Sequence, residues 1–229
     1  MNILEMYILL EYSAIIPIIV GILRWKYISP FLKCQVLALS IMLLGDFFAN
    51  STAVVSSLNS LFFDVLGLKI SPENNLFIYF ISYSLSLTAI FHAWLNVPEY
   101  KAIDRKRIYI FSAVSIAIIV CWSIFQNWFS AAMFFQDYAL FGLLHTAVLL
   151  ALSLQFFHSF LNTETFEPEL RNPLFFVAFA HMVFAVPSAF IILLSSISSS
   201  AVATDIWIGR EISYCISNFI IVLAFFVKK

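Results

Sequence analysis

Long apolar stretches alternate with short polar clusters along this sequence, and their lengths predict a bundle of helices. A helix needs about 20 apolar residues to cross the roughly 30 Å hydrocarbon core of a bilayer. Seven stretches meet that requirement, and all are continuous rather than alternating, which excludes transmembrane strands. They cover about residues 4–24, 33–53, 75–97, 108–126, 138–161, 174–197 and 204–227. The pattern therefore predicts an all-α, polytopic protein with a single transmembrane domain over residues 1–229.

The connection between the second and third stretches is the longest and carries its own helical pattern. Leu58, Leu61, Phe62, Val65 and Leu66 repeat at helical spacing within it. This predicts an interfacial helix at about residues 56–67, lying on the outer leaflet. The alternative is a lid over an opening on that side.

Lysine and arginine gather on one side of the predicted bundle, which sets its orientation. One such residue, Lys69, is predicted on the opposite side, and Arg210 falls inside the seventh stretch. Because basic loops stay in the cytoplasm, we predict the N-terminus outside and the C-terminus in the cytoplasm. Trp25 and Trp94 fall at cytoplasmic ends of stretches, where interfacial anchors are expected. The basic residues on the predicted cytoplasmic side are Arg24, Lys26, Lys33, Lys101, Arg105, Lys106, Arg107, Arg171, Lys228 and Lys229.

Composition and charge exclude several classes of protein. Apolar residues make up 62% of the chain and charged residues 11%, against about 45–50% and about 25% in soluble proteins. The net charge of -1, without a basic tract, gives no sign of nucleic-acid binding. No CxxC or paired-histidine spacing occurs, so we expect no metal and no cofactor. The absence of lysine from every predicted span core excludes a retinal Schiff base.

Polar side chains from five stretches fall at one predicted depth, in the outer half of the bundle. Charged groups are costly in hydrocarbon, so each needs a partner, a cavity or a function. These side chains lie about seven residues from the outer ends of their stretches, which at a rise of about 1.5 Å per residue is about two turns. They are Glu11, Asp46, Tyr83, His145, Arg210 and Glu211. Three histidines (His92, His158 and His181) are predicted nearer the cytoplasmic side.

The seventh stretch carries a polar stripe that should face the bundle interior. Arg210, Ser213, Tyr214, Ser217 and Asn218 follow the i, i+3, i+4, i+7, i+8 spacing of one helix face. Ile212, Phe219 and Ile220 should then face lipid or neighbouring helices. Tyr79, Ser82, Tyr83 and Ser86 form a similar stripe in the third stretch, with hydroxyls that also suit tight helix packing.

The charges at the outer level do not balance. Glu11, Asp46 and Glu211 oppose one arginine, Arg210, and one titratable group, His145. This predicts a protonated carboxyl, a cationic His145 or a bound cation, with Arg210 as counter-ion of Asp46 or Glu11. The pattern fits a structural ion-pair network, a ligand or substrate site, or a path for protons or ions.

One segment around Asp46 resembles part of a known enzyme family. The stretch Leu32-Lys-Cys-Gln-Val-Leu-Ala-Leu-Ser-Ile-Met-Leu-Leu-Gly-Asp46 is similar to the second-helix region of lysoplasmalogenase-type membrane proteins. That resemblance implies that Asp46 is a catalytic acid acting on the vinyl ethers of lysolipids. The family's second aspartate motif has no counterpart here, and its members usually have eight helices.

A second resemblance covers most of the chain. Ile28-Ser-Pro-Phe-Leu-Lys33, Asn74-Asn-Leu-Phe-Ile-Tyr79 and Asn218 resemble small seven-helix bacterial integral membrane proteins with no assigned function. It implies the bacterial inner (cytoplasmic) membrane and supplies no activity.

The preferred hypothesis is a binding or sensing protein with an outward-facing polar cavity for a small or amphipathic ligand. Besides membrane lipid, its partner would be a separate signalling protein on the cytoplasmic side. One alternative is a lipid hydrolase with Asp46 and Glu11 as acid and base and His145 assisting. The other is a proton-coupled secondary transporter. The predicted ligand-binding residues are Glu11, Asp46, Tyr83, His145, Arg210, Glu211 and Tyr214.

Overall fold

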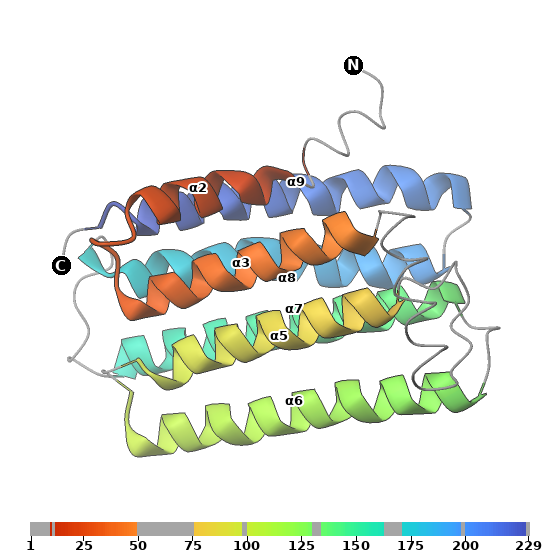
Figure 1. The fold of residues 1–229 in the computed structure, drawn as a ribbon, viewed down its shortest axis with the longest axis horizontal. Coiled ribbons are helices and arrows are strands. Elements are labelled where there is room, and N and C mark those ends of the chain that lie inside the picture. The colour runs from red at the N-terminus through yellow and green to blue at the C-terminus, as the bar shows by residue number, and fades with distance from the viewer. Residues whose placement is uncertain are drawn as a thin grey trace.

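The computed structural model describes residue 10 and residues 12–49, 76–97, 100–129, 134–162, 171–197 and 200–227. Every regular element in these ranges is helical, which confirms the all-α fold (Figure 1). A 3-10 turn, η1 (Tyr12–Ala14), leads into α2 (Ile15–Leu23). The predicted interfacial helix at about 56–67 lies outside the described residues. The remaining helices are α3 (Pro30–Ala49), α5 (Leu76–Leu95), α6 (Ala102–Phe129), α7 (Phe134–Asn162), α8 (Pro173–Ile197) and α9 (Ser200–Ala224).

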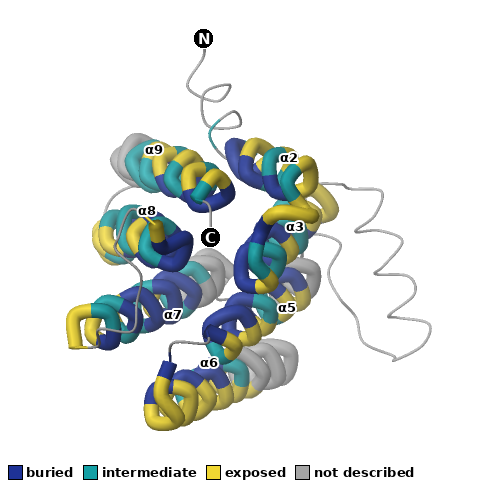
Figure 2. Tube along the Cα trace, turned by 90° about the vertical axis from the view of Figure 1, so that its left-hand side faces the viewer, coloured by how far each residue is buried: buried dark blue, intermediate teal, exposed yellow. Residues whose placement is uncertain are grey.

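Six of the described helices form a ring, and α6 lies outside it (Figure 2). Around the ring, α2 is followed by α3, α5, α7, α8 and α9, and α9 packs against α2 again. Gly21 lets α2 come close to α3, because a Cβ at this position would collide with the Val36 side chain. The ring therefore encloses an interior into which side chains from several helices can project.

Two helices that begin at the same end of the bundle have the same kind of N-terminal cap. Ser29 precedes Pro30, and its hydroxyl accepts a hydrogen bond from the Leu32 amide at 3.3 Å. Asn172 precedes Pro173, and its Oδ1 accepts a bond from the Leu174 amide at 2.9 Å. A polar N-cap followed by proline satisfies amides that have no partner inside the helix and presets its first turn.

Helix α6 begins earlier than its apolar stretch predicts. Residues 105–107, which the hydropathy pattern places in a connection, lie in its first turns with exposed side chains. Asp104 is buried and supports this start, because its Oδ2 accepts a bond from the Lys101 amide at 3.3 Å. Its Oδ1 accepts a bond from Gln155 Nε2 of α7 at 2.7 Å. One carboxylate thus caps α6 and ties it to the ring.

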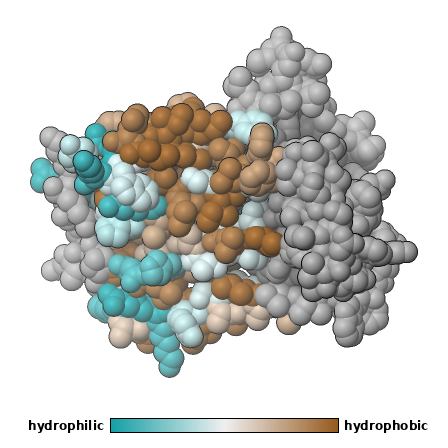
Figure 3. Space-filling model, viewed as in Figure 1, coloured by the Kyte–Doolittle hydropathy of each residue, from teal (hydrophilic) through white to brown (hydrophobic). Residues whose placement is uncertain are grey.

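Four of the described helices contain segments long and apolar enough to cross a membrane: Pro30–Phe48, Gly142–Asn162, Pro173–Leu194 and Trp207–Ala224. Large apolar side chains point outward around the bundle, among them Ile19 (52% exposed), Phe190 (64%) and Leu223 (54%). Figure 3 shows this apolar surface beside a hydrophilic end. A soluble protein rarely exposes so much contiguous apolar surface, so the described part has the character of an integral membrane protein. Seven spans and their orientation stay predictions.

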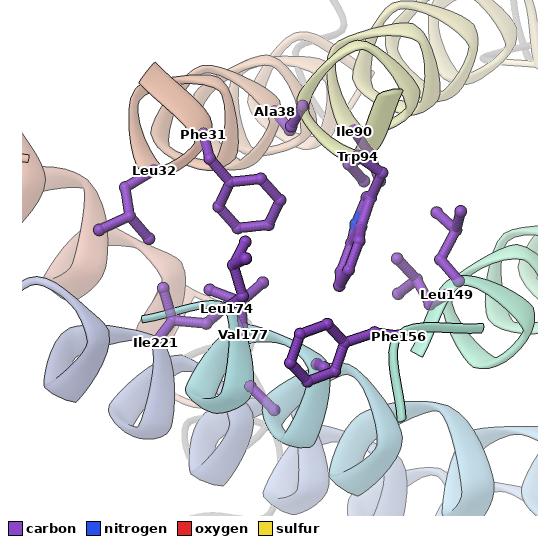
Figure 4. Close-up of a cluster of buried hydrophobic side chains, with 14 of the residues drawn as sticks. Phe31, Leu32, Ala38, Ile90, Trp94, Leu149, Phe156, Leu174, Val177 and Ile221 are labelled. Carbon is purple, nitrogen blue, oxygen red and sulfur yellow. The ribbon is translucent and has the colours of Figure 1, made fainter. Parts of the chain in front are cut away.

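Trp94 lies in the core rather than at an interface, which corrects its predicted role as an anchor. Its side chain is 0% exposed. Its ring lies 5.2 Å from Phe31, 5.9 Å from Phe156, 6.3 Å from His181 and 6.4 Å from Tyr100, measured between centroids. Figure 4 shows Trp94 and Phe31 facing Phe156 across the interior. Aromatic contacts between several parts of the chain therefore hold this end of the bundle together.

Helices α3 and α5 approach each other closely at Gly45. A Cβ added there would collide with the Cβ and Oγ atoms of Ser82, which is buried. In lipid, where apolar surface gains little from helix association, close packing of small residues supplies much of the attraction between helices. The predicted packing use of the third stretch's hydroxyls is confirmed at Ser82.

We expect Gly45→Ala to lower the free energy of unfolding by about 1–3 kcal/mol, because the added methyl forces α3 and α5 apart. Thermal unfolding in nanodiscs measures the effect. Gly209→Ala on α9 is the matched control, since its methyl would meet Ile191 Cδ1 at an ordinary 3.4 Å. Adding Ser82→Gly to Gly45→Ala should restore stability. Equal effects of the two single substitutions would show that the close approach is absent.

Candidate functional site

A cavity of about 30 Å³ lies inside the ring, and we call it the chamber. Residues of α3, α5, α7, α8 and α9 line it, so it occurs only when these five helices are assembled. Its wall combines aliphatic and aromatic groups with seven polar side chains. The lining residues are Gln35, Ala38, Leu39, Met42, Ser86, Ile90, His145, Leu149, His181, Phe184, Tyr214, Ser217, Asn218 and Ile221.

Five of the polar side chains around the chamber carry a buried atom without a hydrogen-bond partner. Each of these side chains is at most 5% exposed. An unpaired buried polar group costs about 1–3 kcal/mol, and folded proteins seldom retain one without water or a ligand beside it. The atoms are Gln35 Nε2, Ser86 Oγ, His145 Nε2, His181 Nδ1 and Asn218 Oδ1.

A second group of polar residues adjoins the chamber, and we call it the polar cluster: Asp46, Tyr83, Arg210, Glu211 and Tyr214. The Tyr83 ring lies edge-on to His145, with 5.4 Å between ring centroids. Tyr214 belongs to both groups, since it also lines the chamber. The cluster and the chamber are therefore continuous.

Phe184 of α8 is the common neighbour of both groups. Its ring centroid lies 5.3 Å from that of Tyr214 and 6.5 Å from that of His145. The Cζ atom of Arg210 lies 5.5 Å from the same centroid, in cation–π contact. One aromatic ring thus neighbours the Arg210 guanidinium, Tyr214 and the histidine of the chamber.

Arg210 forms an ion pair with Glu211, its neighbour in sequence. Arg210 Nη1 lies 2.6 Å from Glu211 Oε1, and the two side chains are 19% and 3% exposed. The prediction that Asp46 or Glu11 is a counter-ion of Arg210 stays a prediction. The Cζ atom of Arg210 also lies 5.1 Å from the centroid of Trp207. The structure therefore places a fixed charge pair beside the chamber.

Asp46 and Glu11 are the remaining predicted site residues. Asp46 is half-buried near the C-terminal end of α3. It is not among the described residues that line the chamber. Glu11 lies outside the described residues, so the acid–base pair of the hydrolase hypothesis stays a prediction.

The polar stripe of α9 faces inward, as the sequence predicted. Ser217 and Asn218 are buried, while Ile212 and Phe219 are 44% and 52% exposed. Asn218 Nδ2 donates a 2.9 Å hydrogen bond to Ser13 Oγ in the 3-10 turn. The same side chain thus joins α9 to the start of the ring and leaves its Oδ1 atom beside the chamber.

Five polar residues of the chamber are absent from the predicted ligand-binding residues. Three of them belong to the predicted polar stripes (Ser86, Ser217 and Asn218), and the other two are Gln35 and His181. His181 was predicted toward the cytoplasmic side and apart from His145, yet both line the chamber. Gln35, near the start of α3, is not among the predicted site residues. A glutamine between two apolar turns, Phe31–Leu32 and Leu37–Leu39, is the signal in the sequence that could have identified it. His92 and His158 are exposed, and each lies beside an asparagine four residues later.

Neither a metal site nor a known relative identifies the activity of the site. Within the described residues, no three His, Cys, Asp or Glu side chains lie close enough together to hold a metal ion. The sequence resembles two groups of membrane proteins, and only the resemblance to lysoplasmalogenase-type proteins implies an activity. The chain matches no protein-family model, no curated protein and no solved structure.

Proposed function

We propose that the chain is a multi-pass protein of the bacterial inner membrane that binds a small polar ligand in the chamber and passes the signal to a cytoplasmic partner. In this proposal seven helices span the bilayer, with the N-terminus outside and the basic end in the cytoplasm. The single observation that carries it is a cavity at which seven polar side chains from five helices meet. The small volume favours a small ligand over an amphipathic one.

The polar cluster marks the end from which the ligand would enter. Asp46 lies near the end of α3, and Arg210 and Glu211 lie in the first half of α9, at the end of the bundle opposite the basic connections. Tyr214 lies one turn beyond Arg210 on α9 and lines the chamber. A polar solute would therefore pass from charged groups to Tyr214 and then to His145.

Pro187 gives α8 a site for the movement that entry requires. It lies inside the helix, one turn beyond Phe184. Proline removes a backbone hydrogen bond to the residue four positions earlier and weakens the helix there. Bending at this turn would move Phe184 away from His145 and Tyr214, and the same motion would carry the signal toward the basic end.

A thermal-shift screen of small polar solutes in nanodiscs tests this function. A ligand at a hundred times its Kd should raise the Tm of the wild-type protein by about 5–10 °C. Ser86→Val, which fills part of the chamber, should abolish the shift. Ser112→Val is the matched control, because Ser112 is a buried helix serine of α6 whose hydroxyl bonds to the Tyr109 carbonyl, away from the chamber.

A proton path is the second candidate, because two histidines line one small cavity. Proteoliposomes with an imposed pH gradient separate the two functions. Pure binding predicts no proton flux. A flux that His181→Phe removes would support the proton path and contradict the binding function. The binding function also fails if the Ser86→Val variant retains the ligand-induced shift.

A further inference from the structure

A short basic and aromatic segment follows α2, at the end of the bundle where α3 begins and α9 ends (Figure 1). In it Arg24 and Lys26 alternate with Trp25 and Tyr27, whose rings are exposed. Its backbone forms a tight turn, because the Tyr27 and Ile28 amides both donate hydrogen bonds to the Arg24 carbonyl, at 2.8 and 3.2 Å. The segment is therefore an ordered connection that presents cations and rings together.

Aromatic rings contact two of the cations at this end. The Cζ atom of Arg24 lies 4.5 Å from the ring centroid of Phe226, just beyond α9, and 6.0 Å from that of Tyr27. Lys33 Nζ, in the first turns of α3, lies 5.4 Å from the centroid of Trp25. Cation–π contacts restrict the position of a charged group without neutralising its charge. Two positive charges are thus held in place by rings from two parts of the chain.

No acidic side chain neutralises these cations in the part of the chain that the structure describes. Neither Arg24 nor Lys33 forms an ion pair there, and Lys26 is exposed without one. Unpaired cations attract anions, and the forked guanidinium of arginine matches the oxygens of a phosphate group. This end of the bundle therefore fits a ligand with a phosphate group and a net negative charge.

The surroundings favour a lipid over a free anion. Ile22 and Leu23, in the last turn of α2 directly before Arg24, are apolar and exposed. Leu223, three residues before Phe226, is exposed as well. Acyl chains are as apolar as these side chains and can lie against them, whereas a free phosphate ion gains nothing from such a surface. The exposed tryptophan and tyrosine of the turn are the residue types typical of a membrane interface.

We propose that Arg24 and Lys33, with the rings of Trp25, Tyr27 and Phe226, form a binding site for the headgroup of an anionic phospholipid. The guanidinium and the ammonium group supply the hydrogen-bond donors for the headgroup oxygens, and the acyl chains follow α2 and α9 into the bilayer. The site shares no residue with the chamber, so it stands or falls independently of the function proposed there.

Quenching of Trp25 fluorescence by brominated phospholipids tests the site in the full-length protein. The protein is reconstituted in phosphatidylcholine vesicles with a minor fraction of brominated phosphatidylglycerol or, for comparison, brominated phosphatidylcholine. The Trp25 signal is the difference between the wild type and Trp25→Phe. Phosphatidylglycerol should quench it at a concentration about 25-fold lower, since each basic residue near an anionic lipid surface contributes about fivefold. Equal quenching by the two lipids would overturn the proposal.

The double variant Arg24→Gln/Lys33→Gln should abolish the preference for phosphatidylglycerol. Lys106→Gln/Arg107→Gln is the matched control, because it removes two exposed positive charges of α6 at the same end of the bundle and should leave the Trp25 signal unchanged. Equal losses in the two variants would show that diffuse surface charge attracts the lipid, which would overturn the site. Phe226→Leu keeps every charge and should also lower the preference, because Arg24 loses its closest ring. An unchanged preference in that variant would contradict the proposed site.

Inorganic phosphate separates the two sources of the anionic group. Added to the same vesicles, it should leave the quenching by brominated phosphatidylglycerol unchanged. Relief of the quenching by phosphate, at constant ionic strength, would assign the site to a free anion and overturn the lipid proposal.

Discussion

Replacing Trp94 with alanine should lower the free energy of unfolding by about 3–5 kcal/mol. The indole is fully buried, and three rings from α3, α7 and the connection before α6 pack around it: Phe31, Phe156 and Tyr100. Its removal leaves a cavity that these rings cannot all close, because each is fixed to a different part of the chain. Reversible denaturation in bicelles measures the loss.

Trp25→Ala is the control for this prediction. Trp25 is 43% exposed and carries the Lys33 ammonium group 5.4 Å from its ring centroid. Its removal opens no internal cavity, so its cost should stay below about 1 kcal/mol. Similar losses for the two tryptophans would contradict the placement of Trp94 in the core.

Arg210→Met should be the most damaging single change in the polar cluster, at about 3–5 kcal/mol of unfolding free energy. The substitution removes the guanidinium and leaves the Glu211 carboxylate, which is 3% exposed, without its ion-pair partner. Glu211→Gln should cost less, because the arginine that remains is 19% exposed and reaches solvent more easily. The same denaturation measurement gives the order of the two losses.

The double variant Arg210→Met/Glu211→Gln isolates the charge as the cause. Removing the stranded carboxylate should recover a large part of the stability that Arg210→Met loses. Arg107→Met, which removes an exposed charge at the other end of the bundle, should change stability by less than about 0.5 kcal/mol. A double variant no more stable than Arg210→Met would show that the pair is held by packing and not by charge.

The helices could be predicted from the sequence better than their ends. Hydropathy locates the part of a helix that suits lipid, and α8 matches its stretch because Asn172 and Pro173 start the helix where the apolar residues begin. For α6, the start of the helix and the start of the apolar stretch differ. Asp104 supports a helix start among charged residues, and this depends on a contact with Gln155 that lies 51 positions away.

The residues of the site could likewise be predicted only in part. Depth along a helix follows from residue spacing, so the common level of Tyr83, His145 and Arg210 was accessible from the sequence. The direction in which a helix face points depends on its neighbours. His181 reaches the chamber because α8 lies between α7 and α9, and no local pattern contains that order. Gln35 was missed for the same reason.

The chamber draws its wall from helices spread over the whole described chain, and this affects how the protein is made. Gln35, Ser86, His145 and His181 all precede α9 in the order of synthesis, while Asn218 arrives with it. Before α9 docks, the growing chain would present polar groups to the bilayer with no wall opposite them. An incomplete chain of this kind is a natural substrate for membrane-embedded chaperones and proteases. The groups that would bind a ligand in the finished protein would then also mark an unfinished one for removal.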